Sequence, residues 1–346
     1  MPADTPSPDP PPDGTAPPPQ SRRERRRAER AAELEADLAR HTGPVNTGQF
    51  PMGEPELPAQ EPAEAEPREL LSPPVKTSRA GRNLPMAIGV GLGLGAVLLA
   101  SLFIQKEVFL GLAVLGCLGA LWELDRGLRT RDLHLPLLPL AVGTVGMLVS
   151  AYTAGIEALL VAFVLTAGGV FVWRVVDGGG TAALQEATTG IFAGAYIPFL
   201  AGFLTIMLSK DDGAMRVLMV IALVVANDTG GYVAGILFGR HPMAPSVSPK
   251  KSWEGAAGSV LVAGAVGVGF ALWGLEVQWW IGALLALGAV LGAVLGDLAE
   301  SLVKRDLGVK DMGTLLPGHG GVLDRVDSIL LASPVVFALM LVLLPG

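Results

Sequence analysis

From Leu84 onward the chain is a succession of apolar runs, each long enough to cross a lipid bilayer as a helix. About 20 apolar residues, each rising ~1.5 Å along a helix, cross the roughly 30 Å hydrocarbon core. The sequence predicts nine such spans: 84–104, 107–122, 136–152, 157–175, 188–208, 215–238, 256–274, 279–298 and 328–345. We therefore expect an all-α, polytopic membrane protein.

This region is too poor in charge for a water-soluble domain. Over the whole chain 51% of residues are hydrophobic and 16% are charged, the formal net charge is −7, and much of the charge falls before residue 84. Soluble domains carry charge on about a quarter of their residues. The single cysteine, Cys117, leaves no intrachain disulfide to form. The composition excludes an ordinary soluble enzyme and a disulfide-stabilised domain.

Residues 1–83 are rich in Pro, Arg and Glu. Such a segment buries too little apolar area to offset its chain entropy, so we expect a disordered cytoplasmic tail before a membrane domain over 84–346. Residues 21–24, Ser-Arg-Arg-Glu, match a capping box and predict a short charged helix over 21–40. Its arginines either contact anionic lipid headgroups or are simply solvated, and the second interpretation is the simpler.

Basic residues predict the orientation of the spans, because cytoplasmic loops carry the excess of Lys and Arg. With the N-terminus inside, eleven basic residues fall in inner loops, and three, Lys106, Lys210 and Arg216, fall in outer loops. Nine spans then place the C-terminus outside.

One predicted span carries an acidic side chain well inside the membrane. Asp228 lies in the run Asn-Asp-Thr-Gly-Gly over 227–231 of span 215–238. An ionisable group there is costly and indicates a functional position, and the two glycines are expected to loosen the helix beside it. The alternative is that Asp228 pairs with a buried cation and only holds helices together.

The next inner loop contains two adjacent lysines beside hydroxyl groups, in Ser-Pro-Lys-Lys-Ser-Trp-Glu-Gly over 248–255. Lysine attracts phosphate as a point charge, and the free N–H groups at the start of span 256–274 add to the field. Ser248, Lys250 and Lys251 are therefore candidate ligands of a polyphosphate. Lysines at the inner end of a membrane helix are more often topology signals, so this pattern alone is weak.

Three carboxylates converge at the inner ends of the last two spans. Asp324 and Asp327 are three residues apart and share a helix face where span 328–345 begins, and Asp297 lies at the same depth in span 279–298. Carboxylates this close repel one another unless a divalent cation lies between them. Oxygen-only ligands favour Mg²⁺, which typically takes one or two carboxylates plus substrate phosphates.

The loop between these spans mixes basic residues, carboxylates and a glycine turn. Gly-His-Gly-Gly over 318–321 can bend sharply and turn N–H groups toward an anion, and His319 is either a substrate ligand or a loop histidine bound to a neighbour. The positions suited to neutralise phosphates are Lys304, Arg305, Lys310 and Arg325. A purely interfacial loop would explain the basic residues but not the interleaved acids and glycines.

This last segment resembles the phosphatidate cytidylyltransferase family, also called the CDP-diacylglycerol synthases. The positions in register with the family pattern are Ser301, Lys304, Arg305, Lys310, Asp311, Gly313, Pro317, His319, Gly320, Gly321, Asp324, Arg325 and Asp327. Residues 248–255 are similar to a second family element, with Ser252 in place of threonine, and residues 228–232 to a third, with Gly231 in place of alanine. The resemblance does not cover residues 1–83.

The resemblance implies a polytopic, all-helical enzyme in the cell membrane with its active site facing the cytoplasm. Such an enzyme transfers the cytidylyl group of CTP to phosphatidic acid in the inner leaflet. The products are CDP-diacylglycerol, for phospholipid biosynthesis, and pyrophosphate, and the reaction requires Mg²⁺. The resemblance also implies a paired cationic centre held by two aspartates, by position Asp297 and Asp324, with K⁺ a candidate for the second ion. No nucleic-acid partner is expected, and the oligomeric state, a homodimer among the options, stays open.

The remaining roles are hypotheses built on this chemistry. The attacking phosphate oxygen is already anionic, so the site must supply cations and alignment rather than a strong general base. Lys250 and Lys251 would bind the triphosphate. The lipid headgroup or the α-phosphate would be held by Lys304, Arg305 and Arg325. The other expected substrate ligands or orienting residues are Ser248, Lys310, His319, Gly320, Gly321, Asp228 and Asp327.

Three alternatives have different signatures. A CTP-dependent polyprenol kinase would use the same phosphates and Mg²⁺ but release CDP, and the motif over 301–327 favours the transferase. A secondary transporter would place its charges near the midplane and show repeated halves, whereas here the charges gather at the inner face. A scaffold that works through its arginine-rich tail would not need the acidic, glycine-rich loop.

Overall fold

The computed structural model describes residues 84–178, 180–244, 248–309, 311–313, 315 and 320–344. At residues 84–88, 90, 243–244 and 248–251 the description covers the backbone alone. The tail predicted to be disordered, with its helix over 21–40, lies outside the described residues. Within them the chain is all-α, except for one short pair of antiparallel strands.

The helices follow the apolar runs of the sequence. They are α2 (Leu84–Ile104), α3 (Lys106–Leu128), α4 (Leu137–Asp177), α5 (Gly180–Gly194), α6 (Leu200–Leu208), α7 (Gly213–Phe238), α8 (Trp253–Gly269), α9 (Trp279–Leu307) and α10 (Leu323–Leu343). Single turns extend three of them: η2 (Arg129–Arg131) after α3, η3 (Ala195–Phe199) between α5 and α6, and η4 (Phe270–Gly274) after α8. Among the described residues, seven helical segments are long and apolar enough to cross a membrane, and Gly91–Ile104 is a shorter apolar helix.

Helix α4 combines two of the predicted spans and reverses direction between them. Gly155 has φ +81° and ψ −157°, a backbone conformation that residues with a side chain rarely adopt. The two halves pack closely, because the Ser150 hydroxyl donates to the carbonyl oxygen of Ala158 at 3.3 Å. Further along, a Cβ added to Gly143 would lie only 2.2 Å from Thr166. Helix α4 is therefore a helical hairpin rather than one long rod.

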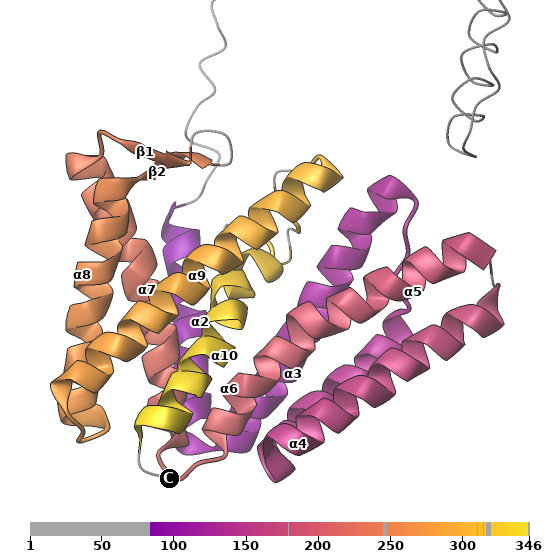
Figure 1. The fold of residues 1–346 in the computed structure, drawn as a ribbon, viewed down its shortest axis with the longest axis horizontal. Coiled ribbons are helices and arrows are strands. Elements are labelled where there is room, and N and C mark those ends of the chain that lie inside the picture. The colour runs from indigo at the N-terminus through magenta and orange to yellow at the C-terminus, as the bar shows by residue number, and fades with distance from the viewer. Residues whose placement is uncertain are drawn as a thin grey trace, which may run out of the picture. The chain divides into compact units, whose positions relative to one another are not determined.

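Two groups of helices make up the bundle in Figure 1. Helices α7, α8, α9 and α10 pack against one another, and α4 packs against α5 and α6. Contacts of α6 with α10 join the groups, and α3 packs against both α4 and α10. Leu121, Met147 and Leu330, from α3, α4 and α10, belong to one buried apolar cluster. This shared core fixes α3 and the start of α10 relative to each other.

Loops predicted on the same side of the membrane lie together in the structure. Lys106, at the start of α3, donates through Nζ to the carbonyl oxygen of Lys210, in the turn before α7. Beyond the other end of α3, the Thr130 hydroxyl approaches the carbonyl oxygen of Leu307 at 3.4 Å. The loops predicted to be outer and those predicted to be inner therefore gather at opposite ends of α3.

Gly230 and Gly231 do not loosen α7, contrary to the prediction; they let α8 approach it. Helix α7 runs from Gly213 to Phe238, through both glycines. A Cβ on Gly258 of α8 would lie 2.7 Å from the carbonyl oxygen of Gly230, and a Cβ on Gly231 would lie 2.6 Å from the Ser259 hydroxyl. Small residues commonly allow such close approach between membrane helices.

Helix α9 continues to Leu307, well past the predicted end of its span at residue 298. Gly308 ends it in a left-handed conformation with φ +71°. Lys304 and Arg305, which were predicted to lie in a loop, therefore occupy the last helical turn, where positive side chains interact favourably with the helix dipole. The loop prediction fails because the apolar run stops before the helix does.

The 248–255 motif forms a strand that leads directly into a helix. Strands β1 (Pro242–Ala244) and β2 (Ser248–Ser252) pair in antiparallel fashion just before α8. Ser252 caps α8, because its hydroxyl accepts the N–H of Gly255 at 3.1 Å. The Glu254 carboxylate lies 2.6 Å from the ring Nδ1 of His241. These contacts fix β2 at the entrance to α8.

Candidate active site

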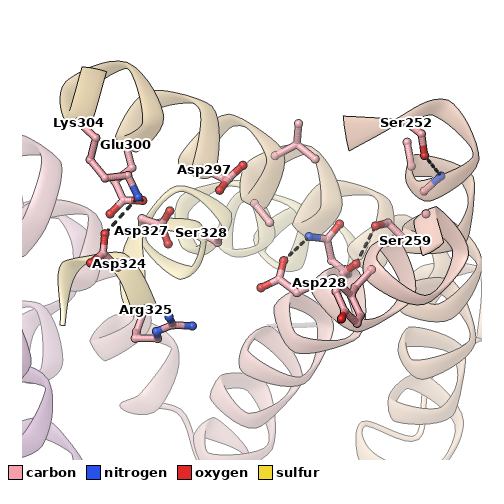
Figure 2. Close-up of a pocket in the computed structure, with 18 of the residues that line it drawn as sticks. Asp228, Ser252, Ser259, Asp297, Glu300, Lys304, Asp324, Arg325, Asp327 and Ser328 are labelled. Carbon is pink, nitrogen blue, oxygen red and sulfur yellow. Dashed lines mark hydrogen bonds and ion pairs between the residues drawn. The ribbon is translucent and has the colours of Figure 1, made fainter. Parts of the chain in front are cut away.

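One cavity of about 440 Å³ collects six of the candidate site residues singled out in the sequence. It lies where α8 and α10 begin and where α7 and α9 approach their ends (Figure 2). Its lining comprises Asn227, Asp228, Gly231, Tyr232, Gly235, Ser252, Gly255, Ala256, Ser259, Ala293, Val294, Asp297, Glu300, Lys304, Asp311, Asp324, Arg325, Asp327 and Ser328. Segments far apart in the chain thus meet at one end of the bundle.

Lys304 links two buried carboxylates across α9 and α10. Its Nζ donates to Glu300 Oε2 at 2.7 Å and to Asp324 Oδ1 at 3.1 Å, as the dashed lines in Figure 2 show. The side chains of Glu300 and Asp324 are only 3% and 8% exposed. Buried charges are tolerated when they are paired and hydrogen-bonded, so Lys304 is needed to compensate both carboxylates.

Asp324 also organises the loop that precedes α10. Its carboxylate accepts the backbone N–H of Met312 at 3.2 Å and that of Gly321 at 3.0 Å. Gly320 has φ +85°, a conformation that favours glycine. The predicted glycine turn is present at Gly320, and the N–H of the next residue points to an anion of the protein itself.

Residues of α7 and α8 form the facing part of the cavity in Figure 2. The side-chain amide of Asn227 donates to Asp228 Oδ1 at 2.9 Å. The Ser259 hydroxyl donates to the carbonyl oxygen of Asn227 at 2.7 Å. Asn227 is buried and Asp228 is exposed, so the amide orients a carboxylate that can reach a ligand.

Acidic groups outnumber basic groups in the described lining of the cavity. Six carboxylates lie there, against two basic side chains, Lys304 and Arg325. No group of three or more His, Cys, Asp or Glu side chains among the described residues is placed to hold a metal ion. Mg²⁺ needs only one or two carboxylates when substrate phosphates supply further oxygens. The six carboxylates of the lining, and the buried Glu300 Oε1 that has no hydrogen-bond partner, fit such an ion.

The structure brings together some of the predicted site residues and separates others. Those lining the cavity are Asp228, Asp297, Lys304, Asp324, Arg325 and Asp327. Asp297 and Asp324, the predicted metal ligands, thus face one cavity from different helices. Arg305 is exposed and lies outside this lining, and Gly320 and Gly321 lie beside Asp324. The backbone alone is described for Ser248, Lys250 and Lys251, while Lys310 and His319 lie outside the described residues.

Several polar lining residues escaped the sequence-based prediction. They are Asn227, Ser252, Ser259, Glu300, Asp311 and Ser328. Glu300 has a readable signal, because it follows Asp297 by three residues and precedes Lys304 by four, the spacing of one helix face. A span that ends at residue 298 hides this periodicity. Asn227, Ser252 and Asp311 lie within the motifs already described but were given no role there. For Ser259 and Ser328 the deciding fact is which helices meet, and local sequence does not encode it.

A second cavity of about 630 Å³ lies between α3, α5 and α9. Its walls are largely apolar, with Leu128, Phe192 and Val303 among them, and its charged lining residues are Arg131, Glu300 and Asp306. Glu300 lines both cavities.

The bundle and its cavity define a class of protein: a multi-pass membrane protein with a built, acidic site for charged ligands at one end of its helices. The sequence profile of the Cytidylyltransferase family matches residues 86–343. The chain belongs to this family, and it is a nucleotidyltransferase.

Similar proteins cover most of the chain. The phosphatidate cytidylyltransferase of Mycobacterium leprae (strain TN) is 41% identical over 291 residues, which cover 78% of this chain and 91% of that protein. The phosphatidate cytidylyltransferase of Mycobacterium bovis is 38% identical over 304 residues, covering 83% and 97% respectively. That of Haemophilus influenzae is 41% identical over 150 residues, covering 40% of this chain and 51% of its own length.

Proposed function

We propose that the protein is a phosphatidate cytidylyltransferase, which converts CTP and phosphatidic acid into CDP-diacylglycerol and pyrophosphate for phospholipid biosynthesis. The observation that carries this proposal is the cavity in which Asp297, Lys304 and Asp324 meet, within a membrane bundle of the Cytidylyltransferase family. The relatives that cover most of the chain bear the same activity in their names.

The barrier of this reaction is largely the repulsion between two phosphates. The attacking oxygen of phosphatidic acid is already ionised, so the site must align the substrates and supply positive charge. Asp297 and Asp324 would hold Mg²⁺, which would supply positive charge to the reacting phosphates. K⁺ is the candidate for a second ion beside them. Asp228 and Asp327 would orient these ligands.

The basic residues would receive the phosphates. The Lys304 ammonium already spans two carboxylates, so an incoming phosphate competes with Glu300 and Asp324 for it. Arg325 lines the same cavity and would hold the lipid headgroup or the α-phosphate. The other proposed ligands of CTP or the headgroup are Ser248, Lys250, Lys251, Arg305, Lys310, His319, Gly320 and Gly321. No residue is required to act as a strong base.

The proposed membrane arrangement has nine crossings, a cytoplasmic N-terminus and an outer C-terminus, in the cell membrane. Two features support nine rather than seven: the reversal of α4 at Gly155 makes two spans of one element, and α2 adds a shorter apolar helix. The excess of basic residues in the predicted inner loops supports a cavity on the cytoplasmic side, where CTP is available. The scheme needs one copy of the chain and is compatible with a homodimer.

Phosphatidic acid would enter from the inner leaflet through the second cavity. The apolar walls suit acyl chains, Arg131 supplies a cation for the phosphate beside the acids Asp306 and Glu300, and Glu300 also lines the first cavity. Thr189→Trp, on the wall of this cavity, is expected to raise the KM for phosphatidic acid about tenfold and leave the KM for CTP unchanged, because the indole fills the lipid space. Thr188→Trp is the matched control, since the neighbouring Thr188 is exposed and lies outside this lining. Equal effects of the two variants would contradict the lipid route.

The activity itself is tested with purified protein in detergent. CTP labelled in its cytidine, with phosphatidic acid and Mg²⁺, is expected to yield a labelled lipid and unlabelled pyrophosphate. A polyprenol kinase would instead release CDP and leave the label out of the lipid. Release of CDP, or the absence of labelled CDP-diacylglycerol, would contradict the proposal.

A further inference from the structure

Glu123 is a buried acid that the proposed chemistry does not use. It lies on α3, its relative exposure is 0%, and it lines neither of the two cavities. A carboxylate removed from water is destabilising unless other groups compensate it. A buried carboxylate at this position is therefore expected to accept a hydrogen bond from a neighbouring group.

That partner is the beginning of α10. Glu123 Oε2 accepts the backbone N–H of Leu323, the first residue of α10, at 3.0 Å. The first N–H groups of a helix lack partners within the helix, and a negative charge there is favourable. The N-cap residue Val322 provides no side-chain cap. An acid 200 positions earlier in the chain thus serves as the cap.

The same carboxylate packs against the loop that holds Asp324. A Cβ on Gly313 would lie 2.2 Å from Glu123 Oε1. A Cβ on Gly321 would lie 2.7 Å from Glu123 Oε2 and 2.8 Å from Asp324 Oδ2. Gly321 is therefore held between two acids, with its N–H bonded to Asp324. A side chain at either point would have to displace the Glu123 carboxylate.

We propose that Glu123 is a positioning residue: it fixes the start of α10 and the Gly313 and Gly321 backbone, and thereby sets the orientation of Asp324 in the cavity. The role given to Asp324 rests on the proposed function. The contact between Glu123 and the loop does not, so the two can be tested separately.

The first test is hydrogen exchange of the full-length protein in detergent without added metal. Glu123→Ala is expected to raise exchange of peptides covering residues 311–327 about tenfold, because the Leu323 N–H loses its acceptor. Asp125→Ala is the matched control: Asp125 is also buried on α3, but it binds the N–H of Leu135 and Arg129. Unchanged exchange in Glu123→Ala, or an equal rise in Asp125→Ala, would overturn the proposal.

The second test is kinetic. Loss of a residue that orients a metal ligand typically lowers activity by 10–100-fold. Glu123→Ala is expected to lower kcat about 30-fold and to raise the Mg²⁺ concentration for half-maximal rate, with the KM for phosphatidic acid unchanged. Glu123→Gln keeps the acceptor and should recover most of kcat. Glu123→Met keeps the volume without an acceptor and should not, so it carries the test if the alanine variant does not fold. Wild-type kcat and Mg²⁺ dependence in Glu123→Ala or Glu123→Met would refute the positioning role. An inactive wild type would refute the proposed function alone, because exchange still reports on the loop.

Discussion

Asp324 accepts hydrogen bonds from Lys304 and from the backbone N–H groups of Met312 and Gly321. Three donors from two segments hold one carboxylate that is almost buried. A side chain fixed in this way needs little reorganisation when a ligand arrives, which is how a site supplies alignment. The residue is therefore placed both to hold its own loop and to face the cavity.

Asp324→Asn is expected to lower kcat about 100-fold, because the amide keeps the shape but removes a charge that would hold the metal. The Mg²⁺ titration should shift to higher concentration at the same time. Asp177→Asn is the control, since Asp177 is 60% exposed and pairs with Arg174, away from the cavity. Full activity of Asp324→Asn at low Mg²⁺ would rule out the metal assignment.

Lys304→Met is expected to destabilise the protein by about 3 kcal/mol, because two buried carboxylates lose their shared cation. Adding Glu300→Gln should restore part of this loss by removing one uncompensated charge, while activity stays low because the phosphate ligand is still missing. Thermal unfolding in detergent and the cytidylyltransferase rate measure the two effects. If Lys304→Met is as stable as wild type, the contacts of Lys304 with Glu300 and Asp324 contribute nothing to stability.

At the scale of elements, glycines decide which helices can form the cavity. Close approach of α7 to α8 depends on Gly230 and Gly258, and that of α9 to α10 on Gly296, where a Cβ would lie 2.6 Å from the carbonyl oxygen of Asp327. The second contact places Asp297 of α9 beside the first turn of α10. The acidic cluster is thus a consequence of helix packing as much as of the acids themselves.

Gly258→Leu is expected to lower stability by about 1–3 kcal/mol and to reduce activity, because its side chain would meet the Cβ of Ala234 and the backbone of Gly230. Gly264→Leu on the same helix is the matched control, since a Cβ there has no neighbour within 4 Å. Unfolding temperature and rate are compared for both. Equal behaviour would mean that this interface does not position the site.

The helices could be predicted because a membrane span needs a long apolar run, and such runs are recognised directly in the sequence. The end of α9 could not, because its last turns are charged, and Lys304 is tolerated in the helix through its pairing with Glu300 four residues earlier. The motif over 301–327 pointed to Asp324. The role of Glu123 could not be predicted, because its hydrogen bond to the Leu323 N–H joins residues 200 positions apart.

At the scale of the whole molecule, the predicted outer and inner loops lie at opposite ends of the bundle, so the number of membrane crossings can be tested. In a Cys117→Ala background, which removes the buried native thiol, single cysteines replace Ala154, Asp177 and Asp211. Because α4 reverses at Gly155, a membrane-impermeant maleimide should reach Ala154→Cys and Asp211→Cys from outside intact cells and Asp177→Cys only in inverted vesicles. Labelling of Ala154→Cys and Asp177→Cys from the same side would mean that the second half of α4 does not cross. The number of crossings would then be even. The side of the membrane on which the C-terminus lies, and the side from which CTP enters, would have to be reassigned.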